Sequence, residues 1–129
     1  MDYEYIDYLQ NKCKFKKATI KGLKDLYDLY EITDFIIGSR MHSIIIGMTQ
    51  EIPTYGLIWQ TKVASLFQMF DMMKYSSNIL NSNVDEIVEI VDSVCKNNNS
   101  YLKVLDKGLN TMRERLLVND RYLDDIREE

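Results

Sequence analysis

The sequence predicts an α/β protein in which a parallel sheet carries helices on both faces, as in half of a doubly wound protein. Short apolar runs alternate with amphipathic segments of about ten residues, the pattern of right-handed βαβ units. One run, FIIG at 35–38, is wholly apolar, as strands buried in a parallel sheet are. A length of 129 residues allows one core, so we expect a single domain over residues 1–129.

The first three elements follow from the hydrophobic spacing at the start of the chain. Residues 2–11 have a weak helical pattern, residues 15–20 (FKKATI) predict a short strand, and residues 21–32 predict a second helix with Gly22 before its apolar face. The apolar side chains that mark the two helices are Tyr3, Ile6 and Leu9 in the first, and Leu23, Leu26, Tyr27 and Tyr30 in the second.

The middle of the chain predicts two strand–helix pairs. FIIG at 35–38 is the first strand, and Ser39 is placed to cap a helix over 40–49. Pro53 opens the second strand, TYGLIW, and a helix follows over 61–70. The side chains expected to be buried are Ile44, Ile45 and Met48 in the first helix, and Val63, Leu66, Phe67 and Phe70 in the second.

The last part of the chain predicts one more strand and two helices. YSSNIL at 75–80 is a short strand, and Asn83 caps the helix with the clearest apolar face, with Glu86 three residues later as in a capping box. NNNS at 97–100 predicts a turn, and the final helix is expected over 101–118. The apolar faces consist of Val84, Ile87, Val88, Val91, Val94 and Cys95 in the first helix, and Leu102, Leu105, Leu109, Met112 and Leu116 in the second.

The composition is that of an ordinary globular protein, with 46% hydrophobic and 28% charged residues. The net charge of -4 and the pI of about 5.0 argue against a nucleic-acid partner, which usually requires a basic face. The lysines within residues 12–17 form a small basic run, which we interpret as a solvated segment before a strand.

The two cysteines and the start of the chain bear on its location. Cys13 and Cys95 form no metal-ligand pattern with the single histidine, so we expect free thiols in a reducing compartment and no metal. No secretory leader follows the first Met, and the longest apolar runs are too short to span a bilayer. We therefore expect a cytoplasmic protein without a transmembrane segment, able to work beside a membrane.

The turn IGSRMHS, between the first buried strand and the next helix, is the best candidate site. Ligands of open α/β sheets bind beyond the carboxyl ends of the strands. Gly38 would let the backbone turn sharply and leave room for a ligand, and a helix that begins near Ser39 would present unpaired N–H groups to an anion. Arg40 adds a guanidinium suited to a phosphate or carboxylate, and His42 can donate or accept a proton. Because helical residues two apart do not share a face, joint contact of both with one ligand requires an irregular first turn.

The loop after the second strand adds Lys62 as a second positive charge and Trp59 as a ring that could stack on a sugar. Each of these residues also has a structural interpretation. Lys62 can be a solvated lysine at the start of a helix, and Trp59 can pack between helices. Arg40 can also be a surface residue without a ligand, and His42 can also be a residue with a structural role.

These residues resemble the C-terminal part of the polysaccharide pyruvyl transferase family. The pattern is an Asp, an apolar run and a Gly, then Arg and His separated by one residue before a helix, then a Pro that opens an apolar strand and a Lys–Val pair in the next loop. In this chain the matching positions are Asp34, 35–37, Gly38, Arg40, His42, Pro53, 54–59, Lys62 and Val63. Order, spacing and element type all agree, and the resemblance covers about residues 20–70.

The resemblance implies a GT-B-like fold of two Rossmann-like domains facing a cleft, with this chain as the C-terminal domain and the N-terminal domain absent. It implies a transferase that moves the pyruvate unit of phosphoenolpyruvate to sugar hydroxyls of a cell-surface polysaccharide, for example in exopolysaccharide biosynthesis, with no cofactor. Arg40 and His42 would be the catalytic residues of the donor site, with Gly38, Ser39 and Lys62 also binding the donor. The saccharide acceptor would lie on the side of the absent domain. The chain is therefore expected to be incomplete alone, and a partner chain or a second copy could cover that surface.

Two other classes of protein remain open. The chain could be the C-terminal domain of another GT-B-like glycosyltransferase that binds a sugar nucleotide, with Glu51 as the acidic residue for the ribose, although Glu51 precedes its strand. It could also be a non-catalytic interaction module whose LYDLY face and C-terminal apolar stripe pack on a partner or a second copy.

Overall fold

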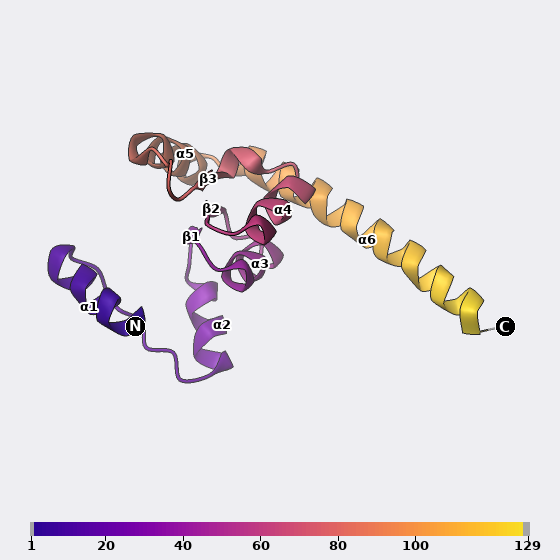
Figure 1. Cartoon of the computed structure of the whole chain (residues 1–129), viewed down its shortest axis with the longest axis horizontal. Coiled ribbons are helices and arrows are strands. Elements are labelled where there is room, and N and C mark those ends of the chain that lie inside the picture. The colour runs from indigo at the N-terminus through magenta and orange to yellow at the C-terminus, as the bar shows by residue number, and fades with distance from the viewer. Residues whose placement is uncertain (1, 128–129) are drawn as a thin grey trace. The chain divides into compact units, whose positions relative to one another are not determined.

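A computed structural model describes the backbone of residues 2–127 and the side chains of residues 4–118. The contacts within the chain divide it into two compact units, Met1–Ile32 and Thr33–Glu129, which are described separately below (Figure 1). A single domain over residues 1–129 stays a prediction. Among the described residues, no helix is both long enough and apolar enough to cross a membrane.

The first unit contains two helices, α1 (Asp2–Lys12) and α2 (Leu23–Glu31). Both helices were predicted, but the strand expected at 15–20 is wrong, because these residues form an irregular segment on the surface of the first unit. A strand needs a neighbouring strand for its backbone N–H and C=O groups, and the described residues of this unit form no strand. The predicted apolar face of α2 is only partly buried, since Tyr30 is buried while Leu23 and Tyr27 are exposed.

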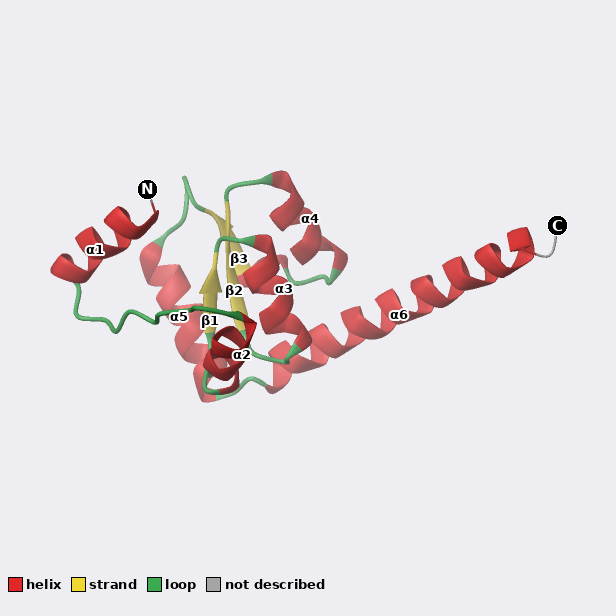
Figure 2. Ribbon diagram, turned by 90° about the horizontal axis from the view of Figure 1, so that it is seen from below, coloured by secondary structure: helices red, strands yellow, loops and turns green. Residues whose placement is uncertain are grey.

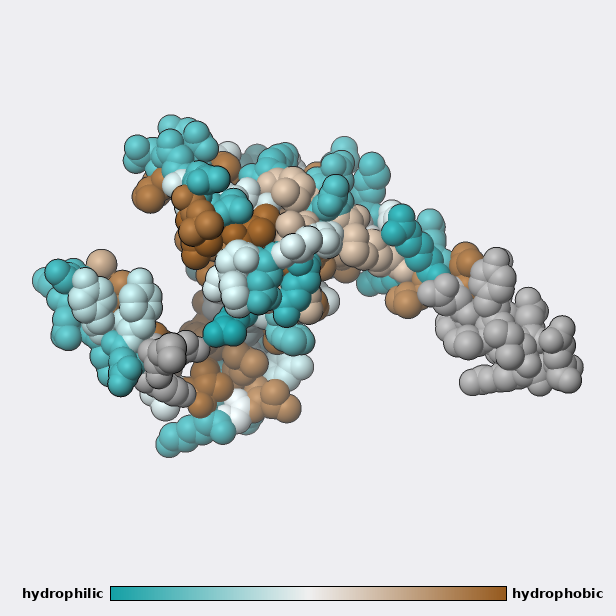
Figure 3. Space-filling view, in the orientation of Figure 1, coloured by the Kyte–Doolittle hydropathy of each residue, from teal (hydrophilic) through white to brown (hydrophobic). Residues whose placement is uncertain are grey.

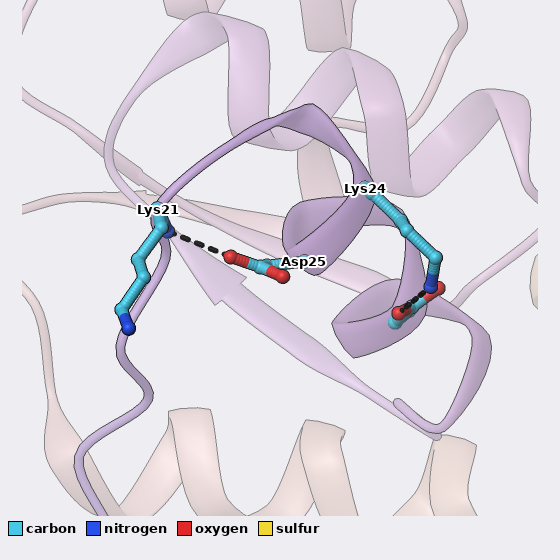
Figure 4. A network of polar contacts seen from close by, with 4 residues as sticks. Lys21, Lys24 and Asp25 are labelled. Carbon is cyan, nitrogen blue, oxygen red and sulfur yellow. Dashed lines mark hydrogen bonds and ion pairs between the residues drawn. The ribbon is translucent and has the colours of Figure 1, made fainter.

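The start of α2 is held by polar contacts rather than by a capping side chain. Gly22 occupies the N-cap position, and the carboxylate of Asp25 reaches back to accept a hydrogen bond of 2.8 Å from the backbone N–H of Lys21 (Figure 4). One turn further along, Lys24 pairs with Asp28 over 2.5 Å on the exposed surface. An acidic side chain in the first turn also interacts favourably with the helix dipole, so Asp25 explains where α2 begins.

The second unit contains the sheet and the remaining helices (Figures 1 and 2). Its elements in chain order are β1 (Ile36–Gly38), α3 (Met41–Thr49), β2 (Thr54–Ile58), α4 (Thr61–Met69), the 3₁₀ helix η1 (Met73–Tyr75), β3 (Ser76–Asn78), α5 (Val84–Lys96) and α6 (Asn99–Arg127).

The three strands form one parallel sheet in the order β1–β2–β3. Gly56 of β2 pairs with Gly38 on one side and with Ser76 on the other. The predicted α/β class is confirmed, as are the three strands of this unit to within their ends. Because the strands are parallel, their carboxyl ends lie at one edge, and the turns into α3 and α4 both begin there.

Glycines let α3 and α4 pack closely on one face of the sheet. A Cβ atom on Gly47 of α3 would lie 2.6 Å from the hydroxyl of Thr54 and from Cδ1 of Ile36, and one on Gly56 would overlap the ring of Phe67. Figure 2 shows α3 and α4 on one side of the strands and α5 on the other. The first strand is less enclosed than predicted, because Ile37 is 54% exposed.

The core of this unit joins α3, α4 and the first half of α6. Its fully buried side chains include Ile44, Val63, Phe67, Tyr101 and Leu105. The hydroxyl of Tyr101 donates to the backbone carbonyl of Thr54 over 3.3 Å, and its ring meets that of Tyr75 edge-on with centroids 4.7 Å apart. Burial raises the pKa of Tyr101 to about 12, since the ionised phenolate would lose its hydration.

Helices α5 and α6 lie where the sequence predicted them, but their apolar faces and ends differ from the prediction. The side chain of Asn83 caps α5 by accepting a hydrogen bond of 2.9 Å from the N–H of Asp85, as predicted. The expected apolar face of α5 is only partly right: Val94 is buried, but Val84 and Val88 are exposed. Helix α6 begins at Asn99 and extends well beyond the predicted residues 101–118.

Candidate functional site

A cavity of about 140 Å³ lies at the carboxyl ends of β1 and β2. It is lined by Ser39, Arg40, Met41, His42, Trp59, Gln60 and Lys62. The two loops that were expected to hold a ligand therefore form one cavity, and it contains four of the five predicted site residues. The fifth, Gly38, ends β1 directly before the lining residues.

Gly38 has a different role from the one predicted. Its φ angle is not positive, so no sharp glycine turn is needed there. A Cβ atom at this position would lie 3.0 Å from Cγ1 of Ile44, tighter than ordinary contacts. Gly38 therefore allows the start of α3 to pack against the end of β1, while its expected place beside a ligand stays a prediction.

Helix α3 begins later than predicted, and this change brings Arg40 and His42 together. Arg40, not Ser39, is the N-cap, with an extended backbone (φ -95°, ψ 127°), and its own side chain makes no capping hydrogen bond. The prediction that Ser39 caps the helix is wrong. Because the backbone is still extended at Arg40, the Arg40 and His42 side chains both line the cavity despite their two-residue spacing. The first turn of α3 is regular, and it is the position of Arg40 before the helix that lets both residues line the cavity.

Two helix N-termini meet at this cavity. Helix α4 begins after Gln60, which is an extended N-cap without a side-chain hydrogen bond, as Arg40 is for α3. The first N–H groups of a helix have no acceptor within the helix, and they carry the positive end of its dipole. Met41, His42 and Lys62 belong to these first turns and line the cavity. The backbone thus contributes positive potential from two directions.

Trp59 connects the two loops. Its indole N–H donates to the backbone carbonyl of Ser39 over 2.9 Å. The guanidinium carbon of Arg40 lies 6.0 Å from the centroid of the Trp59 ring. At that distance a cation is attracted to the face of the ring. The side chain remains 50% exposed, so it does not wedge between helices as one interpretation proposed.

The side chains at the cavity suit a small anion. Arg40, His42 and Lys62 are all exposed, and none of the described residues that line the cavity is acidic. Together with the two helix N-termini they can bind a ligand that carries two negatively charged groups. His42 can hydrogen-bond such a group or transfer a proton.

Sequence reasoning missed one residue of the cavity lining. Gln60 was not singled out, although its position directly before the first residue of a helix was the available signal. Glu51, considered for a ribose, lies before β2 and lines a separate cavity of about 150 Å³ with residues of α6. Among the residues that the structure describes, no group of three acidic, His or Cys side chains could hold a metal ion.

No family model matches the chain, and no curated protein or solved structure is significantly similar to it. The class that the structure defines is an α/β protein with a three-stranded parallel sheet and a positively charged cavity at the carboxyl ends of two strands.

Proposed function

We propose that this chain is the donor-binding domain of a polysaccharide pyruvyl transferase, and that it binds phosphoenolpyruvate in the cavity at the carboxyl ends of β1 and β2. The observation that carries the proposal is that Arg40, His42 and Lys62, taken from two separate loops, line one cavity with two helix N-termini. The same three residues occupy the positions by which the sequence resembles that family.

The donor has two anionic groups, a phosphate and a carboxylate, and the cavity offers two kinds of binding group for them. The forked guanidinium of Arg40 can hold one group with two parallel hydrogen bonds. The first turns of α3 and α4, with Lys62 as a point charge, would hold the other. The absence of acidic residues from the described lining favours a ligand with net negative charge.

The proposed reaction places His42 at the proton-transfer step. Protonation of the terminal CH₂ carbon of the enol would leave an oxocarbenium-like centre at the adjacent carbon. A sugar hydroxyl would attack that centre and lose its proton, and the bond from this carbon to the phosphate oxygen would then break. His42 would assist proton transfer, while Arg40 and Lys62 would stabilise the departing phosphate. Attack by a second hydroxyl would complete a cyclic ketal.

The proposal includes a larger GT-B-like enzyme in which this chain is the C-terminal domain and works in the cytoplasm. The saccharide acceptor would be bound by a second domain, a partner chain or a second copy across the cavity. Transfer would therefore require that second component, while donor binding is a property that the chain can be tested for alone.

Calorimetric titration of phosphoenolpyruvate into the chain tests the donor site, with inorganic phosphate and a uridine diphosphate sugar as comparison ligands. We expect saturable binding of phosphoenolpyruvate that the double variant Arg40→Ala, His42→Ala loses. The variant Lys103→Ala, which removes an exposed lysine of α6 outside the cavity, is the control and should bind as the parent does. Equal binding by the parent and the double variant would refute the proposal, and preference for the sugar nucleotide would favour the glycosyltransferase alternative.

A further inference from the structure

Helix α6 is longer than the core that it packs against. Its 29 residues span about 43 Å, and the core of its own unit covers only the first part. Tyr101 and Leu105 are almost completely buried, whereas every side chain described from 113 to 118 is exposed. Figures 1 and 2 show the second half of the helix extending away from the strands and the other helices of this unit.

A heptad repeat runs through the whole helix. Apolar residues alternate at spacings of three and four at Leu102, Leu105, Leu109, Met112 and Leu116. The same spacing continues in the sequence through Asn119, Leu123 and Ile126, with the asparagine as its one polar member. Such a repeat is the pattern of the a and d positions of a coiled coil.

The structure uses only the first part of this repeat. Leu105 is 1% exposed, while Leu116, three members later in the same repeat, is 61% exposed. Figure 3 shows apolar side chains, in brown, on the stretch of α6 that leaves the core, just before the atoms drawn in grey. An exposed continuation of a heptad repeat lacks the second helix that such a repeat normally packs against.

The charges beside the repeat favour a second copy of the same chain as the partner. With Leu116 at position a, Arg113 and Arg115 take the flanking positions e and g, and Asp120 takes the next e position. In a parallel pair, Arg115 of one copy meets Asp120 of the other, and in an antiparallel pair Arg113 can do so. Each arrangement forms the contact twice by symmetry, so the segment is complementary to itself.

We propose that residues 113–126 of α6 pair with the same segment of a second copy as a two-stranded coiled coil. The segment is only about two heptads long, so the dimer forms in a concentration-dependent equilibrium. This pairing is independent of the donor site, and its test requires no ligand. A failure here therefore leaves the proposed function untouched, and the reverse also holds.

Sedimentation equilibrium of the whole chain over a range of concentrations tests the pairing, with the variants Leu116→Lys and Leu117→Lys compared side by side. The two leucines are adjacent and similarly exposed, at 61% and 58%, but only Leu116 belongs to the repeat. We expect Leu116→Lys to raise the dimer dissociation constant at least about tenfold and Leu117→Lys to change it less than about twofold. Far-UV circular dichroism of both variants at high dilution verifies that α6 remains helical.

The charge contacts provide a second, independent measurement. Asp120→Arg should weaken the dimer, and a compensating exchange should restore it: Arg115→Asp for a parallel pair, or Arg113→Asp for an antiparallel pair. A chain that stays monomeric up to about millimolar concentration, equal effects of the two leucine variants, or restoration by neither exchange would overturn the proposal. Binding of a different protein to a monomeric chain would also overturn it.

Discussion

The indole N–H of Trp59 donates a hydrogen bond of 2.9 Å to the backbone carbonyl of Ser39. The two residues follow the carboxyl ends of β1 and β2, so this bond links the two loops that form the cavity. It also positions the ring near the Arg40 guanidinium. A single contact between a side chain and the backbone thus joins two loops whose charged side chains, Arg40 and Lys62, are exposed.

Trp59→Phe should loosen the cavity without unfolding the protein. Phenylalanine keeps an aromatic ring for Arg40 but removes the donor to Ser39. Because the site is half exposed, we expect a loss of only about 0.5 kcal/mol in the free energy of unfolding, at the low end for a hydrogen bond. Affinity for phosphoenolpyruvate should fall about threefold, because the loops are less well positioned. Urea unfolding and calorimetry measure the two effects, and unchanged affinity would show that this bond does not organise the site.

Arg40→Lys tests the geometry of the guanidinium separately from its charge. Lysine preserves the positive charge but cannot form two parallel hydrogen bonds to one phosphate or carboxylate. We expect Arg40→Lys to lower the affinity for phosphoenolpyruvate about tenfold. This loss should be most of the loss that Arg40→Ala causes. Calorimetry of the three proteins at one ionic strength makes the comparison. If lysine binds as well as arginine, the site recognises charge alone.

Gly56→Ala should destabilise the sheet. Its new methyl group would overlap Cε2 and Cζ of the buried Phe67 ring, and overpacking of this kind costs about 2 kcal/mol. A second change, Phe67→Leu, should recover part of the loss. Gly22→Ala is the control, because nothing lies within 4 Å of a Cβ atom there. In urea unfolding, the free energy of unfolding of Gly56→Ala should be well below that of Gly22→Ala. Equal values for the two variants would contradict the close packing of α4 on β2.

Asn83→Ala and Ser39→Ala distinguish a working cap from an unused one. The Asn83 side chain accepts a hydrogen bond from Asp85, so its loss should cost about 1 kcal/mol. Ser39 was expected to cap α3 but does not, and Ser39→Ala should stay within about 0.5 kcal/mol of the parent. Chemical denaturation of both variants measures the difference. A cost at Ser39 equal to that at Asn83 would contradict the helix start observed at Arg40.

Tyr101 should make stability depend on pH in the alkaline range. Its pKa is raised from 10.0 to about 12 by burial, so the unfolded chain releases this proton at lower pH than the folded chain. The contribution of protonated Tyr101 to the free energy of unfolding is fully present below about pH 10 and is lost as the pH rises to about 12. Between these two pH values the loss is about 1.4 kcal/mol for each pH unit.

Comparison with Tyr101→Phe isolates this contribution, because the other titrating groups are common to both proteins. The variant also loses the hydrogen bond to the Thr54 carbonyl, which should cost about 1 kcal/mol at neutral pH. The parent's advantage over the variant should fall by about 1.4 kcal/mol between about pH 9 and about pH 11, so that the variant becomes slightly the more stable protein at the upper end of that range. A constant difference across that range would mean that Tyr101 ionises as an exposed tyrosine does.

Much of the fold could be predicted from local pattern. The strands at 36–38 and 54–58, the helices between and after them, and the Asn83 cap depend on nearby residues, and the structure confirms them. The strand predicted at 15–20 is wrong for a reason that local sequence does not contain, namely that the described residues of its own unit include no second strand to pair with it. The exposed positions of Val84 and Val88 were also unpredictable, because they depend on which side of α5 meets the core.

By itself, the sequence determined the α/β class, the order of the elements from β1 to α6, and the residue types at the candidate site, because hydrophobic periodicity and capping act over a few residues. Only the tertiary structure decided that Arg40, His42 and Lys62 line one cavity and that Trp59 joins its two loops. It also decided that α3 starts after Arg40 and that Gly38 serves close packing. These features depend on how the ends of two parallel strands and the starts of two helices meet in space, and no local stretch of residues encodes that meeting.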